Sequence, residues 1–322
     1  MSTSEELKNN FPRIKEKVYL DKYTTFRIGG PAKYFLKVSD KKELVMIIKK
    51  SVELKIPFIV IGGGSNILFP SKGYNGLVIV YKKEKALESL SKKKISEKDY
   101  LIDVDADMLL SSLIFELKDF SGLEWAIGIP GTLGGAINGN AGAFNESISD
   151  SIESVNFLEI EGNNVLEKTY KKKECLFGYR TSIFKNNPNL FILKATLKMT
   201  KDEEKSIKER INYNLKERII KQPKGFSAGS IFKNYFGEID QKIILKYKEL
   251  GGKKIISAGL LIDLAGLKGK KIGGAKISED HANFIINFNN ATSEDVLNLI
   301  KIIKKEVKKK FLIELQEEIK IF

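Results

Sequence analysis

AIGIPGTLGGAINGNAGAFN, residues 126–145, is a charge-free run crowded with glycine. Each glycine loses more backbone entropy on folding than any other residue, so such a run needs a purpose, either positive φ angles or close backbone approach. Its polar atoms are Asn, Thr and peptide amides, which suit a ligand held by N–H groups rather than by charged side chains. A pyrophosphate-bearing cofactor is such a ligand. The run therefore predicts a cofactor loop, and a plain succession of turns is the alternative.

A second glycine-rich loop follows a short apolar segment upstream. Residues 56–61 (IPFIVI) predict a buried strand, and GGGSN at 62–66 follows it directly. The loop lacks the Gly-Lys-Ser/Thr of a Walker A motif, and it has neither the spacing nor the acidic residue of a Rossmann fingerprint. Two amide-rich loops that match neither common nucleotide fold predict a different cofactor-binding scaffold.

Composition narrows the class of protein. With 322 residues, 42% hydrophobic and 30% charged, the chain is typical of a globular protein of two or three modules. The polar first ten residues do not resemble a signal peptide, and no segment predicts a transmembrane helix. Cys175 is the single cysteine, which excludes an internal disulfide and suits a reducing cytoplasm, where we expect the protein. With one histidine and one cysteine, we expect no metal site.

The formal net charge of +14 invites a nucleic-acid interpretation. The lysines are scattered, however, and lack the aromatic interleaving of a base-stacking surface. Solvated lysine-rich faces are the favoured interpretation, and the excess charge can attract polyanionic small molecules. A basic module that binds RNA or DNA is the alternative; it predicts a colourless protein whose affinity for oligonucleotides falls steeply with salt.

Hydrophobic periodicity predicts the order of the elements. In the first half we expect a strand–helix–strand–strand unit at 35–38, 41–55, 58–61 and 77–80, then a strand at 101–105 and a helix at 109–120. Antiparallel strands follow at 154–160 and 191–199, and a charged helix at 202–222 is the candidate domain connector. The last elements are a helix from Thr292, its N-cap, to about Lys309, and a final strand at 312–319.

Six segments, in order, resemble the motifs of UDP-N-acetylenolpyruvoylglucosamine reductases, the MurB family, over about residues 24–320. They are TTFRIGGPA at 24–32, GSN at 64–66, the glycine run at 128–142, YRTS at 179–182, AGSIFKN at 228–234, and AGLLID through HANFIIN at 258–287. The spacing from Arg180 to Ser230 is short and resembles the second type of the family, which lacks the extra loop whose tyrosine covers the substrate.

The resemblance implies an α+β fold with an FAD-binding domain of the PCMH or vanillyl-alcohol-oxidase type. We expect this domain at 20–200, with subdomains of about 20–85 and 86–200, a helical connector at 201–222, and a smaller α+β substrate-binding domain at 223–322. The implied activity is the NADPH-dependent reduction, through FAD, of a UDP-amino-sugar enolpyruvyl ether to UDP-N-acetylmuramate in peptidoglycan synthesis. We expect a monomer that neither binds nucleic acid nor inserts into a membrane. The alternative on this scaffold is an FAD oxidase that uses oxygen. NADPH would not bleach the flavin of such an oxidase.

The resemblance also implies the site residues. Ser230 is the expected proton donor, and Arg180 the group that faces the substrate carboxylate. The acidic partner is Glu318, with Glu317 open as a one-residue slip because QEEI stands at 316–319 where the family has Glu-Pro-Glu-Val. Strand side chains alternate in direction, so only one of the two glutamates can face the site. Tyr235 stands where the family usually has proline.

The remaining expected site residues fall into two groups. Those expected to bind the cofactor are Gly62, Gly63, Gly64, Ser65, Asn66, Gly128, Pro130, Gly131, Gly134, Gly135, Asn140, Ala141 and Gly142. Those expected to bind the substrate are Tyr179, Lys233 and Asn234.

Overall fold

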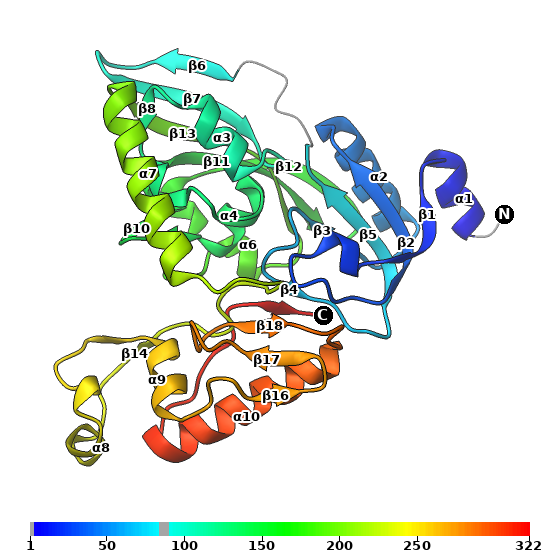
Figure 1. Ribbon diagram of the computed structural model, residues 1–322. Helices are drawn as coiled ribbons and strands as arrows, with labels where there is room; N and C mark the ends of the chain where they lie inside the picture. Colours follow the sequence, from blue (N-terminus) through cyan, green and yellow to red (C-terminus); the bar gives the residue numbers. More distant parts are fainter. Residues whose placement is uncertain (1–2, 84–89) are drawn as a thin grey trace. The chain divides into compact units, whose positions relative to one another are not determined.

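The computed structural model describes residues 3–83 and 90–322, and its contacts divide the chain into two compact units (Figure 1). Unit 1 comprises residues 1–17, 32–63 and 75–218. Unit 2 comprises residues 18–31, 64–74 and 219–322. Each unit is therefore assembled from three separate segments of the chain.

The first sheet of unit 1 confirms the predicted strand–helix–strand–strand unit. Its strands lie in the order β1-β2-β5-β3, and β3 pairs with β5 in parallel. Helix α2 begins after Asp40, whose side chain accepts the N–H of Lys42, and it buries Leu44, Ile47 and Ile48 in the core of this region. The bounds are α1 (Thr3–Asn10), β1 (Lys15–Tyr19), β2 (Pro31–Val38), α2 (Lys41–Glu53), β3 (Phe58–Ile61) and β5 (Tyr74–Tyr81).

The second sheet of unit 1 has six strands, in the order β12-β11-β13-β7-β6 with β8 beside β13. β11 and β13 are antiparallel, as the alternating pattern predicted. The short helices pack around a core that contains Trp125, and Ile211 and Leu215 of the long helix α7 pack against it. The bounds are β6 (Ser91–Lys94), β7 (Asp99–Asp105), α3 (Leu110–Glu116), β8 (Phe120–Ser121), α4 (Leu133–Gly139), β9 (Gly142–Ala143), β10 (Glu146–Ser147), α5 (Ile148–Ser151), β11 (Ile152–Glu161), β12 (Asn164–Lys171), α6 (Ile183–Asn186), β13 (Leu190–Lys201) and α7 (Glu204–Lys221).

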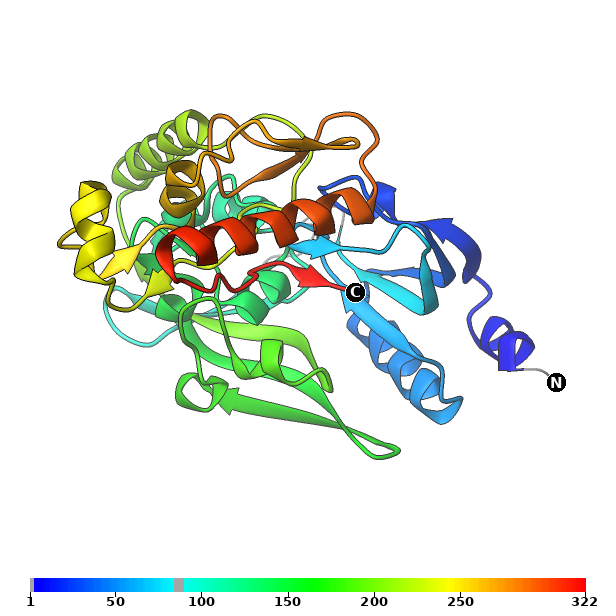
Figure 2. The same cartoon turned by 90° about the horizontal axis from the view of Figure 1, so that it is seen from below.

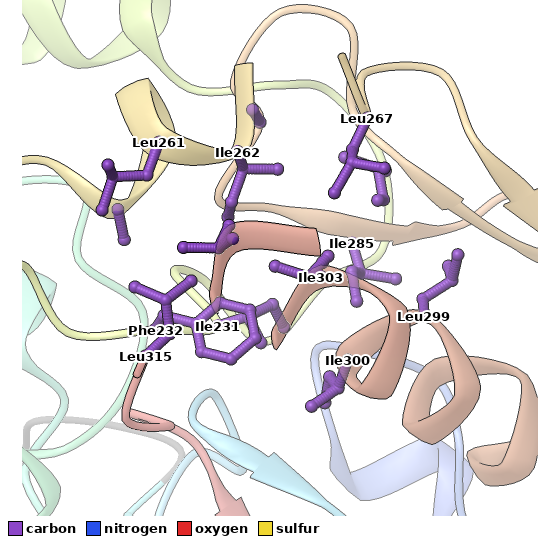
Figure 3. Close-up of a cluster of buried hydrophobic side chains, with 14 of the residues drawn as sticks. Ile231, Phe232, Leu261, Ile262, Leu267, Ile285, Leu299, Ile300, Ile303 and Leu315 are labelled. Atoms are coloured by element: carbon purple, nitrogen blue, oxygen red, sulfur yellow. The ribbon is translucent and has the colours of Figure 1, made fainter. Parts of the chain in front are cut away.

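Unit 2 is built around the long helix α10 and a three-stranded antiparallel sheet, β16-β17-β18. Thr292 caps α10 as predicted: its hydroxyl accepts the N–H of Asp295, whose carboxylate accepts the N–H of Thr292 in return. Apolar residues of α9, α10 and the segment 228–232 share one core (Figure 3). The bounds are β4 (Ile67–Leu68), β14 (Tyr235–Phe236), α8 (Gln241–Lys246), β15 (Ile255–Ile256), α9 (Ala258–Leu264), β16 (Lys271–Ile272), β17 (Ala275–Ile277), β18 (Ile285–Asn287), α10 (Ser293–Phe311) and β19 (Lys320–Ile321).

The predicted strand at 312–319 is wrong. Leu312 takes a left-handed conformation with φ 58° and ends α10, after which the chain turns back beside that helix (Figure 2). Ile313 and Leu315 alternate because both pack into the core of unit 2, and regular strand pairing starts only at β19, which lies parallel to β4. Alternation here reports burial beside a helix rather than membership of a sheet.

Candidate active site

The two glycine-rich loops contact each other within unit 1. A Cβ atom added to Gly62 would collide with Oγ1 of Thr132. One added to Gly63 would lie 2.7 Å from Cα of Gly131. Real Cβ atoms do not approach this closely, so glycine allows the Thr132 side chain to pack on Gly62 and the backbone of Gly131 to pack on Gly63.

The second loop contains a short helix, α4, so it is not the succession of turns that was its alternative. The hydroxyl of Thr132 caps this helix by accepting the N–H of Gly135 at 3.3 Å. Two further N–H groups, of Leu133 and Gly134, donate to the carbonyls of Met108 and Ala106, both at 2.8 Å. The start of α4 is therefore fixed to the chain that leaves β7.

The chemistry of the two loops fits FAD. The two loops lie together, and residues 126–145 include no charged side chain. Gly128, Pro130 and Gly135 of the second loop are exposed. Backbone without side chains or charge, which a bulky cofactor can approach closely, is what glycine-rich cofactor loops supply. The residues that would hold FAD are thus the glycines of 62–64 and 128–142.

Arg218 is a residue of this region that the sequence interpretation missed. Its Nε donates to the carbonyl of Ile127 at 2.8 Å and its Nη2 to the carbonyl of Trp125 at 3.1 Å, immediately before Gly128. Partial burial lowers the pKa of Arg218, because water solvates its charge less well there. The helical spacing could have indicated it, because Arg218 lies seven residues after Ile211, on the face of α7 that packs against the core.

Arg180 lies at a tight turn in unit 1. Gly178 and Thr181 exchange backbone hydrogen bonds across the turn, and Arg180 has a left-handed φ of 54°, which is costly for a side-chain-bearing residue. Its Nη2 donates to the carbonyl of Gly142 at 2.6 Å, and its Cζ lies 5.2 Å from the ring centroid of Tyr179, which is 40% exposed. The structure therefore brings Tyr179, predicted to bind substrate, and Arg180, predicted to be catalytic, to the end of the second glycine loop.

Ser230 lies in unit 2 on a segment that is fixed on both sides. Ser230 forms an isolated β-bridge with Phe284. Asn283, which is 4% exposed, accepts the N–H of Phe232 at 3.0 Å and donates to its carbonyl at 2.8 Å. Ile231 and Phe232 point into the apolar core (Figure 3), so the backbone that carries the Ser230 hydroxyl has little freedom.

The C-terminal glutamates lie beside this segment. The N–H of Glu318 donates to the carbonyl of Ile231 at 2.8 Å, and Glu317 forms a β-bridge with Phe232. The carboxylate of Glu317 forms an ion pair with Lys304 of α10 at 2.8 Å. The side chains of Glu317 and Glu318 are both partly buried.

Asn66 of the first glycine loop contacts the same C-terminal segment. Its side-chain amide donates to the carbonyl of Glu318 at 3.2 Å, and its carbonyl accepts the N–H of Lys320 at 2.9 Å. Both contacts lie within unit 2. They connect the end of the loop directly to the backbone of the predicted acidic residue.

After Asn234 the chain makes an excursion that contains α8 and returns through β15. Tyr235, where the family usually has proline, pairs with Ile256 across β14 and β15. The side-chain oxygen of Asn234 accepts the N–H of Ala258 at 3.2 Å, so the two ends of residues 235–257 are joined. The excursion therefore leaves the motif residues on either side of it adjacent. The N–H of Lys233 donates to the carbonyl of Gln316 at 2.9 Å.

The one histidine has a structural place in unit 2. Nδ1 of His281 accepts the N–H of Asn283 at 3.2 Å, and its ring lies 4.8 Å from that of Phe284. Burial is the main cause that lowers its pKa, so the ring favours the neutral form.

In residues 3–83 and 90–322, no group of three or more His, Cys, Asp or Glu side chains is arranged to hold a metal ion. Over the same residues, none of the helices combines the length and apolar character that crossing a membrane requires.

Two family models match the chain: the C-terminal domain of UDP-N-acetylenolpyruvoylglucosamine reductase at residues 222–322, and an FAD-binding domain at residues 32–165. A UDP-N-acetylenolpyruvoylglucosamine reductase of Chlamydia trachomatis is 39% identical, over 97% of this chain and 98% of its own. One of Caldanaerobacter subterraneus is 38% identical, over 96% and 95%. The crystal structure of the reductase from Thermus caldophilus matches with a TM-score of 0.74 and 31% identity, over 96% of this chain and 99% of that one.

Proposed function

The chain belongs to the family of UDP-N-acetylenolpyruvoylglucosamine reductases, and we propose on that basis that it reduces the enolpyruvyl ether of UDP-N-acetylglucosamine to UDP-N-acetylmuramate. The reductant is NADPH, and the reaction supplies a precursor of peptidoglycan. The observation that carries this proposal is the 39% identity to such a reductase across 97% of the chain. The paired glycine loops support it, because their chemistry suits the cofactor of the matched FAD-binding domain.

FAD held by the glycines of 62–64 and 128–142 would supply the hydride chemistry that links NADPH to the vinyl group of the substrate. The chain's own residues must then orient the substrate, stabilise the negative charge that develops on its carboxylate, and supply a proton to the adjacent carbon. Arg180 suits the second task, since a guanidinium is always charged and binds a carboxylate through two parallel N–H groups. The turn holds the backbone of Arg180 at a positive φ, which supports a defined position for its side chain.

Ser230 is the proposed proton donor. A serine hydroxyl is a weak acid, so it can act only where its position relative to the substrate is closely controlled. The reciprocal hydrogen bonds between Asn283 and Phe232 and the burial of Ile231 supply that control for the backbone. Lys233 and Asn234 follow in the same motif, and we propose that they bind the substrate.

Glu318 is the proposed acidic partner, in preference to Glu317. The ion pair with Lys304 already engages the carboxylate of Glu317, and the apolar residue after Glu318 aligns it with the family's glutamate. A carboxyl group there can stabilise the enol form of the intermediate or share its proton.

Ser230→Ala tests the proposed chemistry. We expect NADPH to reduce the flavin of this variant at the wild-type rate, because the hydroxyl takes no part in that step. Re-oxidation by the enolpyruvyl substrate should slow by about 100- to 10,000-fold, the usual range for loss of a general acid. Ser227→Ala, in the same segment, is the matched control and should keep both rates. An unchanged re-oxidation rate in Ser230→Ala would remove Ser230 from the proton transfer.

A cytoplasmic location and a monomeric state stay predictions. The single cysteine suits the first, because the chain cannot form an internal disulfide. Size-exclusion chromatography with light scattering tests the second.

A further inference from the structure

Asn140 lies at the end of helix α4, on the second glycine loop. It has a left-handed φ of 44° at the C-cap and is only 6% exposed. Its side-chain amide donates to the carbonyl of Gly178 at 2.8 Å, and its side-chain oxygen accepts the N–H of Ser149 at 3.2 Å. Both ends of the side chain are thus occupied by protein backbone, although the sequence predicted Asn140 as a cofactor ligand.

Gly178 opens the turn that carries Arg180. Since Arg180 holds a left-handed φ of 54°, the turn is strained and persists only if the surroundings fix it. Outside the turn, the hydrogen bond from Asn140 is what fixes the carbonyl of Gly178. The bond therefore fixes the turn at a position two residues before Arg180.

The loop and the turn are joined at three alternate residues, and α4 and α6 lie side by side there (Figure 1). The carbonyl of Asn138 accepts the hydroxyl of Ser182 at 2.7 Å. The carbonyl of Gly142 accepts Nη2 of Arg180 at 2.6 Å. On the loop side these two contacts use backbone carbonyls, which any residue would supply. The side-chain amide of Asn138 also donates to the carbonyl of Phe184 in α6 at 3.1 Å, beyond the turn. Among the three contacts to residues 178–182, the one from Asn140 is the one that uses the loop residue's own side chain.

We propose that Asn140 is a positioning residue for Arg180. Its amide holds the turn so that the guanidinium meets the substrate carboxylate, and it couples the glycine loop to the substrate side of the site. This inference rests on the proposed function, in which Arg180 binds that carboxylate. Two features together explain why asparagine stands here: it tolerates a left-handed φ, and it donates and accepts at once.

Asn140→Gly removes the side chain while keeping a residue that favours positive φ. We expect flavin binding and its reduction by NADPH to stay at wild-type values. Re-oxidation by the enolpyruvyl substrate should slow by about 10- to 100-fold and need more substrate for half-saturation, the usual effect of a misplaced binding group. Asn145→Gly is the matched control, because Asn145 is an exposed asparagine of the same loop with φ 66°. It should change neither half-reaction.

A double-mutant cycle separates positioning from general stability. In an Arg180→Ala background, Asn140→Gly should slow re-oxidation no further, because the residue through which it acts is gone. Thermal denaturation of each variant shows whether the fold is kept. An unchanged re-oxidation rate in Asn140→Gly, an equal loss in both half-reactions, or an additive effect with Arg180→Ala would each overturn the inference. Failure of the proposed function itself is a separate result: the wild-type flavin, reduced by NADPH, would not be re-oxidised by the substrate.

Discussion

Replacing Asp107 with asparagine should stabilise the protein at pH 8 and change its stability little at pH 4. Asp107 is 0% exposed, and neither of its carboxylate oxygens accepts a hydrogen bond within the described residues. Burial is the main cause that raises its pKa to about 6, from an ordinary value of 3.8; Lys83 nearby opposes the rise, and Asp105 and Asp40 add to it. The ionised carboxylate is therefore a cost to the folded state.

The magnitude follows from the pKa. A carboxyl group whose folded-state pKa is raised destabilises the fold when ionised, so the penalty is absent well below pH 3.8, grows up to about pH 6 and is constant above it. The difference is about 2 pKa units, and each unit is worth about 1.4 kcal/mol, which gives about 3 kcal/mol at pH 8. At pH 4 less than about 1 kcal/mol remains. Asparagine carries no charge, so we expect a gain approaching these values.

Urea denaturation followed by the fluorescence of Trp125 measures this gain. Trp125 is the single tryptophan and is 1% exposed in the core of unit 1, which also contains β7. Asp105→Asn is the matched control: its carboxylate is 42% exposed and paired with Lys83, so its loss should cost at most about 1 kcal/mol. A gain of the same size for Asp107→Asn at pH 4 and pH 8, or a loss at pH 8, would refute the reasoning.

Three further substitutions test the loops, the acidic partner and the last helix. Gly63→Ala should destabilise unit 1 by about 1–3 kcal/mol, because the new Cβ would lie 2.7 Å from the backbone of Gly131. Gly139→Ala is the control and should not destabilise it, because a Cβ there meets no atom within 4 Å. Thermal denaturation compares the two variants. Glu318→Gln should slow flavin re-oxidation by substrate and Glu317→Gln should leave it unchanged in stopped-flow traces, and the reverse order would assign the site to Glu317. Thr292→Ala should cost about 0.5–2 kcal/mol in denaturation experiments through loss of the cap on α10, and no loss would contradict that capping role.

Local elements were predictable because their causes are local. The cap at Thr292 lies within three residues of the N–H that it accepts, and α2 follows from the spacing of Leu44, Ile47 and Ile48. The glycine loops were also predictable, since glycine at 62–64 and 128–142 has few explanations other than close backbone approach.

Contacts between distant segments were not predictable in the same way. The bond from Asn140 to Gly178 joins residues 38 positions apart, and no local pattern encodes it. The strand predicted at 312–319 failed for a related reason: Ile313 and Leu315 alternate because they pack on a helix, and alternation alone cannot name the partner. The pairing of Tyr235 with Ile256 was not predicted either, because Ile256 lies 21 residues further along the chain.

The central claim is tested most directly by an anaerobic absorbance trace of the purified protein, to which NADPH and then the enolpyruvyl substrate are added. We predict that NADPH bleaches the flavin band and that the substrate restores it, with UDP-N-acetylmuramate as the product. A flavin that NADPH does not bleach would indicate the oxygen-using oxidase. Bleaching without recovery would contradict the substrate, and the lack of a flavin band after addition of FAD would contradict the assignment of the glycine loops.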